Sequence, residues 1–478
     1  MSTKRRDFLK LSGLTGIGLI GSTLLGSASG LGSEEYEFQK MGAQRFNMCG
    51  YAAPKLEKVR VGFIGLGMRG PTHVYGFSHI QGVEIMGLCD IRPEKVRAME
   101  KQLSGSLHKP TSYSGDENAW KKMCDREDID LIVIATPWAL HVPQAVYAMK
   151  AGKHVAIEVP AAKTMDECWQ LVKTSEKTKK HCMMMENCCY DFFELITLNM
   201  ARQGFFGELL HGEGAYIHDL LELNFSKNGY YNMWRLKENY RNGNLYATHG
   251  LGPVAQAMNI NRGDKMVALS STSGNDFTMA EHARELAAKD SFYNEFANKN
   301  YRGNMNITNI LTEKGRTITL YHDVSTPGPY SRIHLLTGTK ATARKYPEPA
   351  RISNGHKWIS QEEFKKMEEQ YTPQIVKRVG EMAKKIGGHG GMDFLMQWHL
   401  IDCLRNGLPL DQDVYDAALW SAVSPLGEWS VAHDSKSIKV PDFTAGAYKT
   451  NKPVVLELEA GDTKVVAVLN KKRFSEII

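Results

Sequence analysis

Short apolar runs alternate with longer amphipathic stretches between residues 59 and 187. Continuous runs of about four to eight apolar residues suit strands that are buried on both faces, as parallel strands are. Strands that alternate with helices predict an α/β domain built on a doubly wound parallel sheet. We expect strands at 61–64, 83–89, 129–136, 154–157 and 182–185, helices at 92–102, 120–124, 142–150 and 166–179, and a loop at 103–118.

The pattern changes after residue 190, where extended runs follow one another with few helices between them. Such a succession indicates an open, mostly antiparallel sheet, so the second domain is α+β. Residues 313–316 predict a hairpin turn between two of its strands. We expect strands at 209–218, 266–273, 304–312, 317–324 and 333–337, helices at 192–203, 393–406 and 413–424, and edge strands at 454–456 and 465–468, while 273–300 shows no clear pattern.

The first 57 residues show neither pattern. Paired arginines, Arg5 and Arg6, precede a glycine-rich apolar run and then small residues, the order of regions in an export signal of the twin-arginine class. The apolar run is short for a membrane span, which needs about 20 residues. We therefore expect periplasmic export and divide the chain into a signal peptide (1–30), a tether (31–57), a first domain (58–189), a second domain (190–440) and a C-terminal segment (441–478).

Composition narrows the possible functions. A chain of 478 residues is long enough for two domains. Its formal charge of +6 comes from scattered basic residues, so we expect no nucleic acid partner. The eight cysteines form no C-x-x-C pair and no Cys/His cluster at ligand spacing, so we expect buried thiols and no metal site. The oligomeric state stays open, and a homo-oligomer is possible.

The first strand runs into a glycine-rich turn with the spacing G-x-G-x-x-G, at Gly65, Gly67 and Gly70. In a βαβ unit such glycines allow a tight turn, close approach to a pyrophosphate and close packing of the next helix, whose N-terminus faces the phosphates. Asp90 ends the second strand, where a carboxylate accepts hydrogen bonds from an adenosine ribose. This Rossmann pattern predicts a dinucleotide site that favours NAD over NADP, although the nearby Arg92 weakens that preference. A cofactor-free α/β domain is the alternative.

Residues 58–425 resemble the Gfo/Idh/MocA oxidoreductases, in which a Rossmann domain precedes an α+β domain whose open sheet faces the nicotinamide. Four segments, 65–70 (GLGMRG), 138–141 (WALH), 158–160 (EVP) and 246–253 (YATHGLGP), more narrowly resemble glycoside hydrolase family 109. Those enzymes are exported, NAD-dependent α-N-acetylgalactosaminidases. Sugar dehydrogenases of the wider family usually carry Glu-Lys-Pro where this chain has Glu158-Val159-Pro160, and Val159 cannot ionise. The departure weighs against net oxidation of a sugar.

The resemblance implies hydrolysis of terminal α-N-acetylgalactosamine from a glycan with net retention. The sugar C3 would be oxidised transiently with bound NAD, which acidifies the C2 hydrogen. A base then removes that hydrogen, the C1 group leaves, water adds and C3 is reduced again. His249 is the first choice for the base, and Tyr246 and Tyr330 come next as proton donors or ring platforms.

The resemblance also assigns the binding residues. NAD would contact Gly65, Gly67, Met68, Arg69, Gly70, Asp90, Trp138, Ala139, Leu140, His141, Glu158, Val159 and Asn187; the sugar would contact Tyr216, Arg235, Tyr246, Ala247, Thr248, His249 and Tyr330. Three simpler interpretations stay open: His141 capping its helix, Tyr330 closing its loop, and His249 as a core histidine. His73, His79, His389 and His399 are interpreted as structural. The competing functions are an exported NAD(P)-dependent sugar dehydrogenase and a non-catalytic sugar-binding protein.

Overall fold

The computed structural model describes residues 44–454 and 461–466 of the chain. The expected signal peptide at 1–30 lies outside these residues, as do residues 455–456 and 467–468 of the two expected edge strands. Val465 lies inside them and forms an isolated antiparallel bridge with Ile80. Among the described residues, no helix is both long and apolar enough to cross a membrane.

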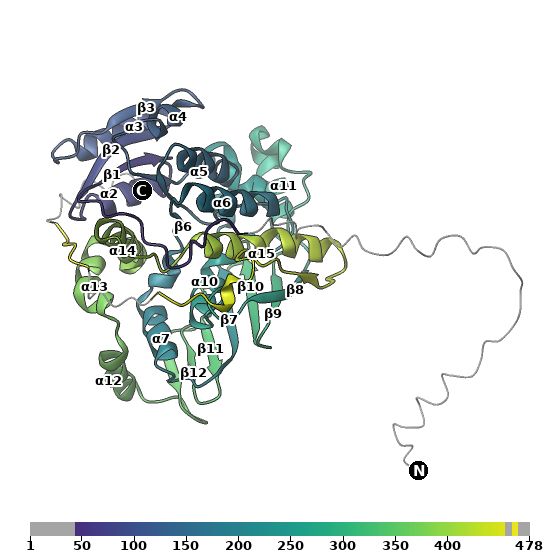
Figure 1. Ribbon diagram of the computed structural model, residues 1–478. Helices are drawn as coiled ribbons and strands as arrows, with labels where there is room; N and C mark the ends of the chain where they lie inside the picture. The colour runs from purple at the N-terminus through teal and green to yellow at the C-terminus, as the bar shows by residue number, and fades with distance from the viewer. Residues whose placement is uncertain (1–43, 455–460, 467–478) are drawn as a thin grey trace, which may run out of the picture. The chain divides into compact units, whose positions relative to one another are not determined.

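The first domain contains a six-stranded parallel sheet in the order β3-β2-β1-β4-β5-β6, the order of a dinucleotide-binding Rossmann fold (Figure 1). This confirms the predicted doubly wound sheet. The strands are β1 (Val59–Ile64), β2 (Val83–Asp90), β3 (Thr111–Ser114), β4 (Leu131–Ile134), β5 (His154–Ile157) and β6 (Cys182–Met184); the helices are α2 (Gly70–Phe77), α3 (Pro93–Leu103), α4 (Ala119–Cys124), α5 (His141–Lys150) and α6 (Met165–Thr178).

Strand β3 falls inside the segment predicted as a loop at 103–118, so that prediction was wrong. It pairs with β2 at the edge of the sheet, from Gly87↔Thr111 to Asp90↔Ser114. Its four residues, Thr-Ser-Tyr-Ser, are mostly exposed and carry no apolar alternation. A short polar edge strand therefore leaves no hydrophobic pattern in the sequence.

The second domain contains an eight-stranded sheet in the order β13-β12-β11-β7-β10-β9-β8-β14. Every neighbouring pair is antiparallel except β7 and β10, which confirms the mostly antiparallel prediction. Gly315, with φ of +77°, turns the chain between β9 and β10, as the hairpin prediction required. The strands are β7 (Leu209–Ile217), β8 (Met266–Ser273), β9 (Asn306–Thr312), β10 (Thr317–Asp323), β11 (Leu335–Gly338), β12 (Thr342–Arg344), β13 (Arg351–Ser353) and β14 (Ile438–Lys439).

The remaining helices belong to the part of the chain after residue 190. They are α7 (Phe192–Arg202), α8 (Leu221–Phe225), α9 (Trp234–Glu238), α10 (Thr248–Ala257), α11 (Met279–Lys289), α12 (Gln361–Tyr371), α13 (Gln374–Ile386), α14 (Met392–Asn406) and α15 (Val414–Ala432). Helix α11 and the 3-10 turn η4 (Ser291–Glu295) occupy the stretch that showed no pattern. Helix α15 passes through Pro425 and does not stop at residue 424 as expected, because its buried residues continue beyond the proline.

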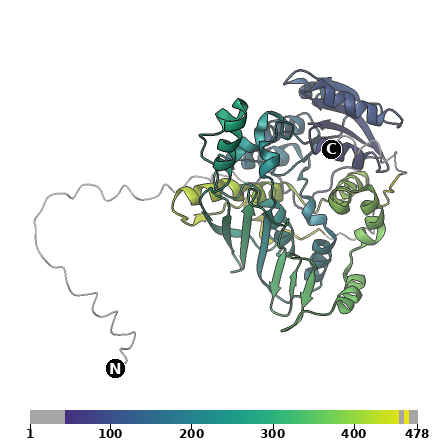
Figure 2. The same ribbon diagram turned by 180° about the vertical axis from the view of Figure 1, so that it is seen from behind.

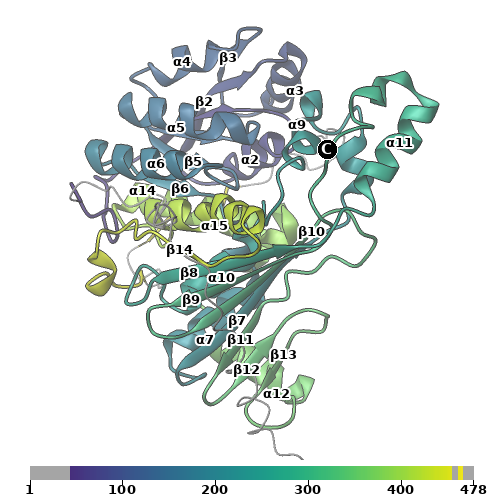
Figure 3. The same cartoon turned by 90° about the vertical axis from the view of Figure 1, so that its right-hand side faces the viewer.

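Two of these helices pack against the first domain. Helix α15 contacts α6 and β6 on one side and β8 on the other, so it lies between the two sheets, as Figures 1, 2 and 3 show. Most of α15 is buried, including all of residues 414–424, as expected for a helix covered on both sides. Helix α14 contacts α2. The glycine turn of the first domain therefore lies next to residues about 320 positions later, since Arg69 and Asp393 are 324 residues apart in a direct contact.

Residues 44–57, the described part of the expected tether, are packed against the protein. Met48 and Ala53 are buried. The amide of Leu56 donates to the carbonyl of Leu404 at 3.1 Å. Gln44 donates to the hydroxyl of Tyr415 at 2.8 Å. This stretch is therefore part of the folded structure.

Candidate functional site

The turn after β1 has room only for glycine at two of its three motif positions. Gly65 has φ of +91°, and a Cβ there would lie 2.6 Å from the Ala135 carbonyl. A Cβ at Gly70 would lie 2.1 Å from the carbonyl oxygen of Gly65. Helix α2, which starts at Gly70, has no side-chain cap and no acidic residue in its first turn. Its free N–H groups and dipole therefore suit the phosphates of a dinucleotide.

Asp90 lies beside this turn, where the motif predicts it. Its Oδ2 accepts from the amide of Leu66 at 2.7 Å, and its Oδ1 accepts from the amide and Nε of Arg92 at 2.9 and 3.2 Å. The Arg92 guanidinium also lies 4.9 Å from the ring centroid of Tyr231. The Asp90 carboxylate, which we expect to accept hydrogen bonds from the ribose, is therefore paired with the Arg92 guanidinium.

The segment 138–141 leaves the carboxyl end of β4 as the 3-10 turn η1 (Trp138–Leu140). Trp138 stacks on Tyr246 of the second domain, with ring centroids 5.7 Å apart. Ala139 and Leu140 are exposed. His141 is fully buried: its Nδ1 and Nε2 lie 2.8 Å from the carbonyl oxygens of Pro160 and Thr136. His141 therefore ties the turns after β4 and β5 together.

An ionic cluster connects the glycine turn to α14. The Nε of Arg69 donates to Glu158 Oε1 at 2.8 Å, and its other end donates to Asp393 Oδ2 at 3.0 Å. His73 Nε2 lies 2.7 Å from the same oxygen of Glu158. Although burial opposes it, Arg69 holds the pKa of both carboxyl groups well below their ordinary values. Val159 is buried next to this cluster, and Asn187 donates to Asp393 Oδ1 at 2.5 Å.

His389 projects from a glycine loop into this cluster. Its Nδ1 lies 2.9 Å from Asp393 Oδ2 and 3.4 Å from Arg69, while 53% of its side chain is exposed. The whole loop, residues 387–391, has positive φ, which four of its five residues adopt readily because they are glycine. The sequence favours a structural role for His73 and His389, but both side chains lie in this ionic cluster. The Gly-Gly-His-Gly-Gly run was the signal that could have identified His389.

The second half of the site begins where α10 meets β7. A Cβ at Gly214 of β7 would lie 2.3 Å from the Gly250 carbonyl, so the two elements touch backbone to backbone. This contact brings Tyr216 and His249 together, with ring centroids 5.4 Å apart. Tyr246 lies 4.5 Å from Tyr216 and 4.8 Å from His249. Three of the predicted sugar-site residues therefore form one aromatic cluster, and Ala247 and Thr248 are buried beside it.

Arg235 and Tyr330 complete this cluster. The Arg235 guanidinium lies 4.7 Å from the ring of Tyr246 and 5.3 Å from that of Trp138. The half-exposed Tyr330 packs edge-on against His218 at 4.9 Å, and the hydroxyl of Tyr216 lies 3.1 Å from His218 Nδ1. His218 was not among the predicted site residues. It lies two residues after Tyr216, and nothing in the sequence around it indicates a functional residue.

Burial determines which of these groups can give or take a proton. It raises the pKa of Tyr216 to about 12, and it also raises the pKa values of Tyr246 and Tyr330. These phenols therefore stay protonated near neutral pH and can donate hydrogen bonds. Burial and Arg235 lower the pKa of His218.

His249 differs because a carboxylate faces it. Its Nδ1 lies 2.7 Å from Oε1 of the buried Glu186, and its Nε2 has no hydrogen bond to a described residue. The Cys188 thiol lies in the same group, with one potential ligand atom from each residue all within 4.8 Å. Two ligands of a tetrahedral zinc, each about 2.0–2.1 Å from the metal, lie roughly 3.3 Å apart. His249 Nδ1 and Glu186 Oε1 are closer than that, at 2.7 Å, so their contact is a hydrogen bond.

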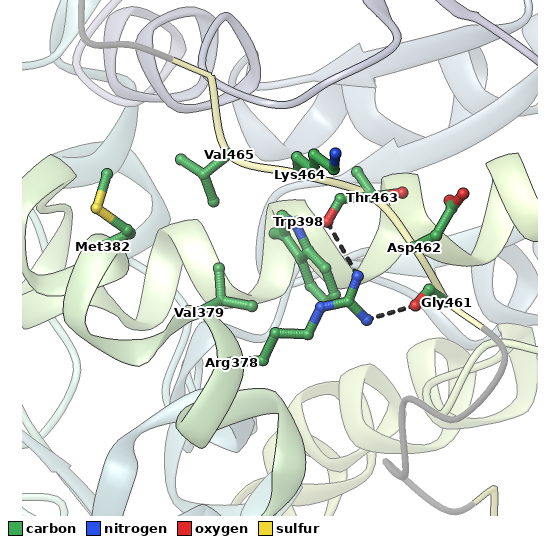
Figure 4. A pocket seen from close by; sticks show the side chains of 9 residues that line it. All are labelled: Arg378, Val379, Met382, Trp398, Gly461, Asp462, Thr463, Lys464 and Val465. Atoms are coloured by element: carbon green, nitrogen blue, oxygen red, sulfur yellow. Dashed lines mark hydrogen bonds between the residues drawn. The ribbon is translucent and has the colours of Figure 1, made fainter.

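A separate pocket of about 580 Å³ lies between α13, α14 and residues 461–465 (Figure 4). Arg378 crosses it, donating to the carbonyl oxygens of Gly461 and Thr463 and lying 5.4 Å from the Trp398 ring. None of the predicted site residues lines it. The contacts in this pocket hold the described C-terminal residues against the helices.

Known families match both halves of the chain. Residues 59–186 match the oxidoreductase family with an NAD-binding Rossmann fold, and residues 190–450 match the family described as glycosyl hydrolase 109, C-terminal domain. The chain belongs to glycosyl hydrolase family 109. Its similarity to curated members of family 109 extends over both domains.

Two curated members of family 109 match most of the chain. The chain is 48% identical to glycosyl hydrolase family 109 protein 1 of Bacteroides fragilis over 421 residues, which cover 84% of this chain and 89% of the relative. It is 43% identical to the alpha-N-acetylgalactosaminidase of Shewanella oneidensis over 461 residues, covering 94% and 98%. Family 109 membership makes this protein a glycosidase with a nicotinamide-binding domain.

Solved structures share the fold at low sequence identity. A levoglucosan dehydrogenase in complex with NADH matches with a TM-score of 0.59 and 15% identity, covering 80% of this chain and 100% of that one. A scyllo-inositol dehydrogenase from Lactobacillus casei with NAD(H) and scyllo-inositol matches with a TM-score of 0.57 and 13% identity, covering 80% and 99%. These neighbours confirm the predicted fold, a Rossmann domain followed by an α+β domain.

Proposed function

We propose that the protein hydrolyses terminal α-N-acetylgalactosamine from glycans, with NAD as a cofactor that is regenerated in each turnover. The observation that carries the proposal is the pairing of a Rossmann glycine turn with an aromatic cluster around His249, on two domains that meet at Trp138 and Tyr246. The alpha-N-acetylgalactosaminidase of Shewanella oneidensis, 43% identical over nearly the whole chain, supports this choice of sugar.

The residues present fit a dinucleotide. Gly65, Gly67 and the uncapped start of α2 would hold its phosphates, and Asp90 would meet the adenosine ribose. The Asp90 carboxylate repels a 2′-phosphate, so we propose NAD over NADP, with Arg92 reducing the difference. Mass spectrometry of the nucleotide released by denaturing the purified protein tests this assignment. NAD in place of NADP is the expected result, and NADP as the main species would contradict it.

A bound nicotinamide supplies reversible hydride transfer, which converts a sugar hydroxyl into a ketone and acidifies the neighbouring C–H bond. The chain must then supply a base for that proton. His249 fits because the Nε2 of its ring has no hydrogen bond to a described residue while Nδ1 is bound to Glu186. An imidazole suits this step at neutral pH. The buried phenols of Tyr216 and Tyr246, with raised pKa values, orient the sugar as hydrogen-bond donors.

Departure of the group on C1 needs a proton donor at the mouth of the site. His389 is half exposed, and Asp393 and Arg69 fix its Nδ1 side. We propose that its outer nitrogen exchanges protons with the leaving group and with water. The loss of an ionisable group at Val159 is consistent with hydrolysis, since a dehydrogenase of this fold would use a lysine there to remove a hydroxyl proton.

Incubation with an aryl α-N-acetylgalactosaminide tests the proposed function. Release of the aglycone without accumulation of NADH is expected. Accumulation of NADH without release would identify a sugar dehydrogenase, and the absence of both would indicate a binding protein.

We also propose export by the twin-arginine route, which moves folded proteins and would allow the cofactor to bind before export. Arg5 and Arg6 support this proposal. Replacing both with lysine should retain the protein in the cytoplasm, as measured by cell fractionation. Unchanged periplasmic activity in that variant would contradict the proposed route.

A further inference from the structure

Glu186 lies at the centre of the site and was not among its predicted residues. It follows β6, and its side chain is fully buried. Its Oε1 accepts from the amide of Cys188 at 3.1 Å and lies 2.7 Å from His249 Nδ1, while its Oε2 has no partner among the described residues. A Cβ on Gly252 of α10 would come within 3.0 Å of Glu186 Cγ, so this helix closes over the carboxylate.

A buried carboxylate is costly unless a hydrogen-bond donor or a positive charge compensates it. Among the described residues, the only titratable side chain in hydrogen-bond contact with Glu186 is His249. Because Glu186 is fully buried and its one side-chain partner is the proposed base, it acts on His249 and has no direct access to the sugar.

We propose that Glu186 is a positioning residue for His249, an inference that rests on the proposed function of His249 as the base. The carboxylate keeps a proton on Nδ1, so the lone pair of Nε2 is free for the sugar. When the proton moves from the sugar C–H to Nε2, the bonding electron pair stays with the sugar. The ring becomes a cation whose charge Glu186 balances, as in other carboxylate–histidine pairs.

Other groups around His249 do not supply this charge. From η2 (Asn187–Tyr190), the Cys188 thiol has a pKa that burial raises well above its ordinary value. Tyr216 of β7 and Tyr246, which precedes α10, have raised pKa values, and His218, which follows β7, has a lowered one. Arg235 carries a like charge to the imidazolium. Glu186 is therefore the only described anion in direct contact with the ring.

Two variants separate orientation from charge. Glu186→Gln keeps an oxygen for the Cys188 amide and for Nδ1 but removes the negative charge, and Glu186→Ala removes both. Glu176→Gln is the matched control: Glu176 is also a buried carboxylate, but its bonds go to the Tyr415 hydroxyl and the Arg45 amide, away from the site. Thermal melting and nucleotide content establish that each variant is folded and loaded.

We expect Glu186→Gln to lower kcat about 10- to 100-fold with KM within about twofold, as for outer partners of catalytic groups. The acidic limb of its pH–rate profile should move to lower pH, because the imidazolium loses its counter-charge. Nitrogen-15 NMR of labelled histidine should show the His249 proton on Nδ1 in the wild type and in Glu176→Gln, and a mixture of tautomers in Glu186→Ala.

An unchanged kcat and pH profile in Glu186→Gln would overturn the inference, as would a wild-type proton on Nε2. If Glu186→Ala does not fold, the isosteric Glu186→Gln and the wild-type NMR spectrum still decide. His249→Ala separates this result from the proposed function. If it is inactive while Glu186→Gln is unimpaired, only the positioning role fails; if it is fully active, the assignment of the base fails.

Discussion

At the scale of single residues, the proposed chemistry depends most on His249, whose Nδ1 is bound to Glu186. His249→Ala removes the proposed base but leaves Tyr216, Tyr246 and the fold in place. We expect kcat to fall about 10²- to 10⁴-fold, the usual contribution of a positioned general base, and the melting temperature to fall as well, because the buried Glu186 loses its one side-chain partner. Steady-state assay with an aryl glycoside and a melting curve measure both. Retention of more than half of the wild-type kcat would contradict the role.

Arg235 is a residue whose geometry matters as much as its charge. Its planar guanidinium lies over the rings of Trp138, Tyr230 and Tyr246. Arg235→Lys keeps the charge but loses the planar stacking, worth about 1–2 kcal/mol in a partly desolvated place. We expect KM for the glycoside to rise about 5- to 30-fold, which is that energy expressed as a ratio. An unchanged KM would show that Arg235 does not position the sugar.

At the scale of elements, the glycine turn gives a matched pair of variants. Gly70→Ala places a Cβ about 2 Å from the Gly65 carbonyl, so the turn must shift. Gly67→Ala meets only the flexible end of Arg92 at 3.4 Å. We expect Gly70→Ala to lower the melting temperature by several degrees and Gly67→Ala to preserve it, because only the first forces backbone atoms apart. Both should weaken retention of the nucleotide, measured as the fraction released by gel filtration. Equal stability of the two variants would contradict this account.

Only some of the helices and strands could be predicted from the sequence. Buried strands such as β4 can be predicted because they are wholly apolar. The glycine turn can be predicted because a Cβ at Gly65 or Gly70 would clash with the backbone, which fixes the spacing of these glycines. The polar edge strand β3 and the continuation of α15 past Pro425 have no such pattern. Helix α14 brings Asp393 to Arg69 across 324 residues, and no local signal encodes that contact. Glu186 can therefore be identified as a site residue only from the folded structure, whereas His389 lies in a Gly-Gly-His-Gly-Gly run that the sequence does show.

At the scale of the whole molecule, the contact between the two domains is sensitive to acid. Glu158 and Asp393 have pKa values lowered by Arg69, against the effect of burial, so they bind fewer protons folded than unfolded. Their contribution to the free energy of unfolding is therefore complete above the ordinary carboxyl pKa of about 4 and is lost as the pH falls below it. Asp393→Asn should reduce the loss of stability between pH 5 and pH 3, seen in urea midpoints, whereas the exposed Asp166→Asn should not. The same slope for Asp393→Asn and wild type would contradict this coupling.

The central claim joins both domains: a glycosidic bond is broken by removal and return of a proton on the sugar ring beside a nicotinamide site. Hydrolysis of an aryl α-N-acetylgalactosaminide in deuterated water, followed by NMR of the released sugar, measures this most directly. The account predicts deuterium at C2 of the product. Complete hydrolysis with only hydrogen at C2 would contradict it.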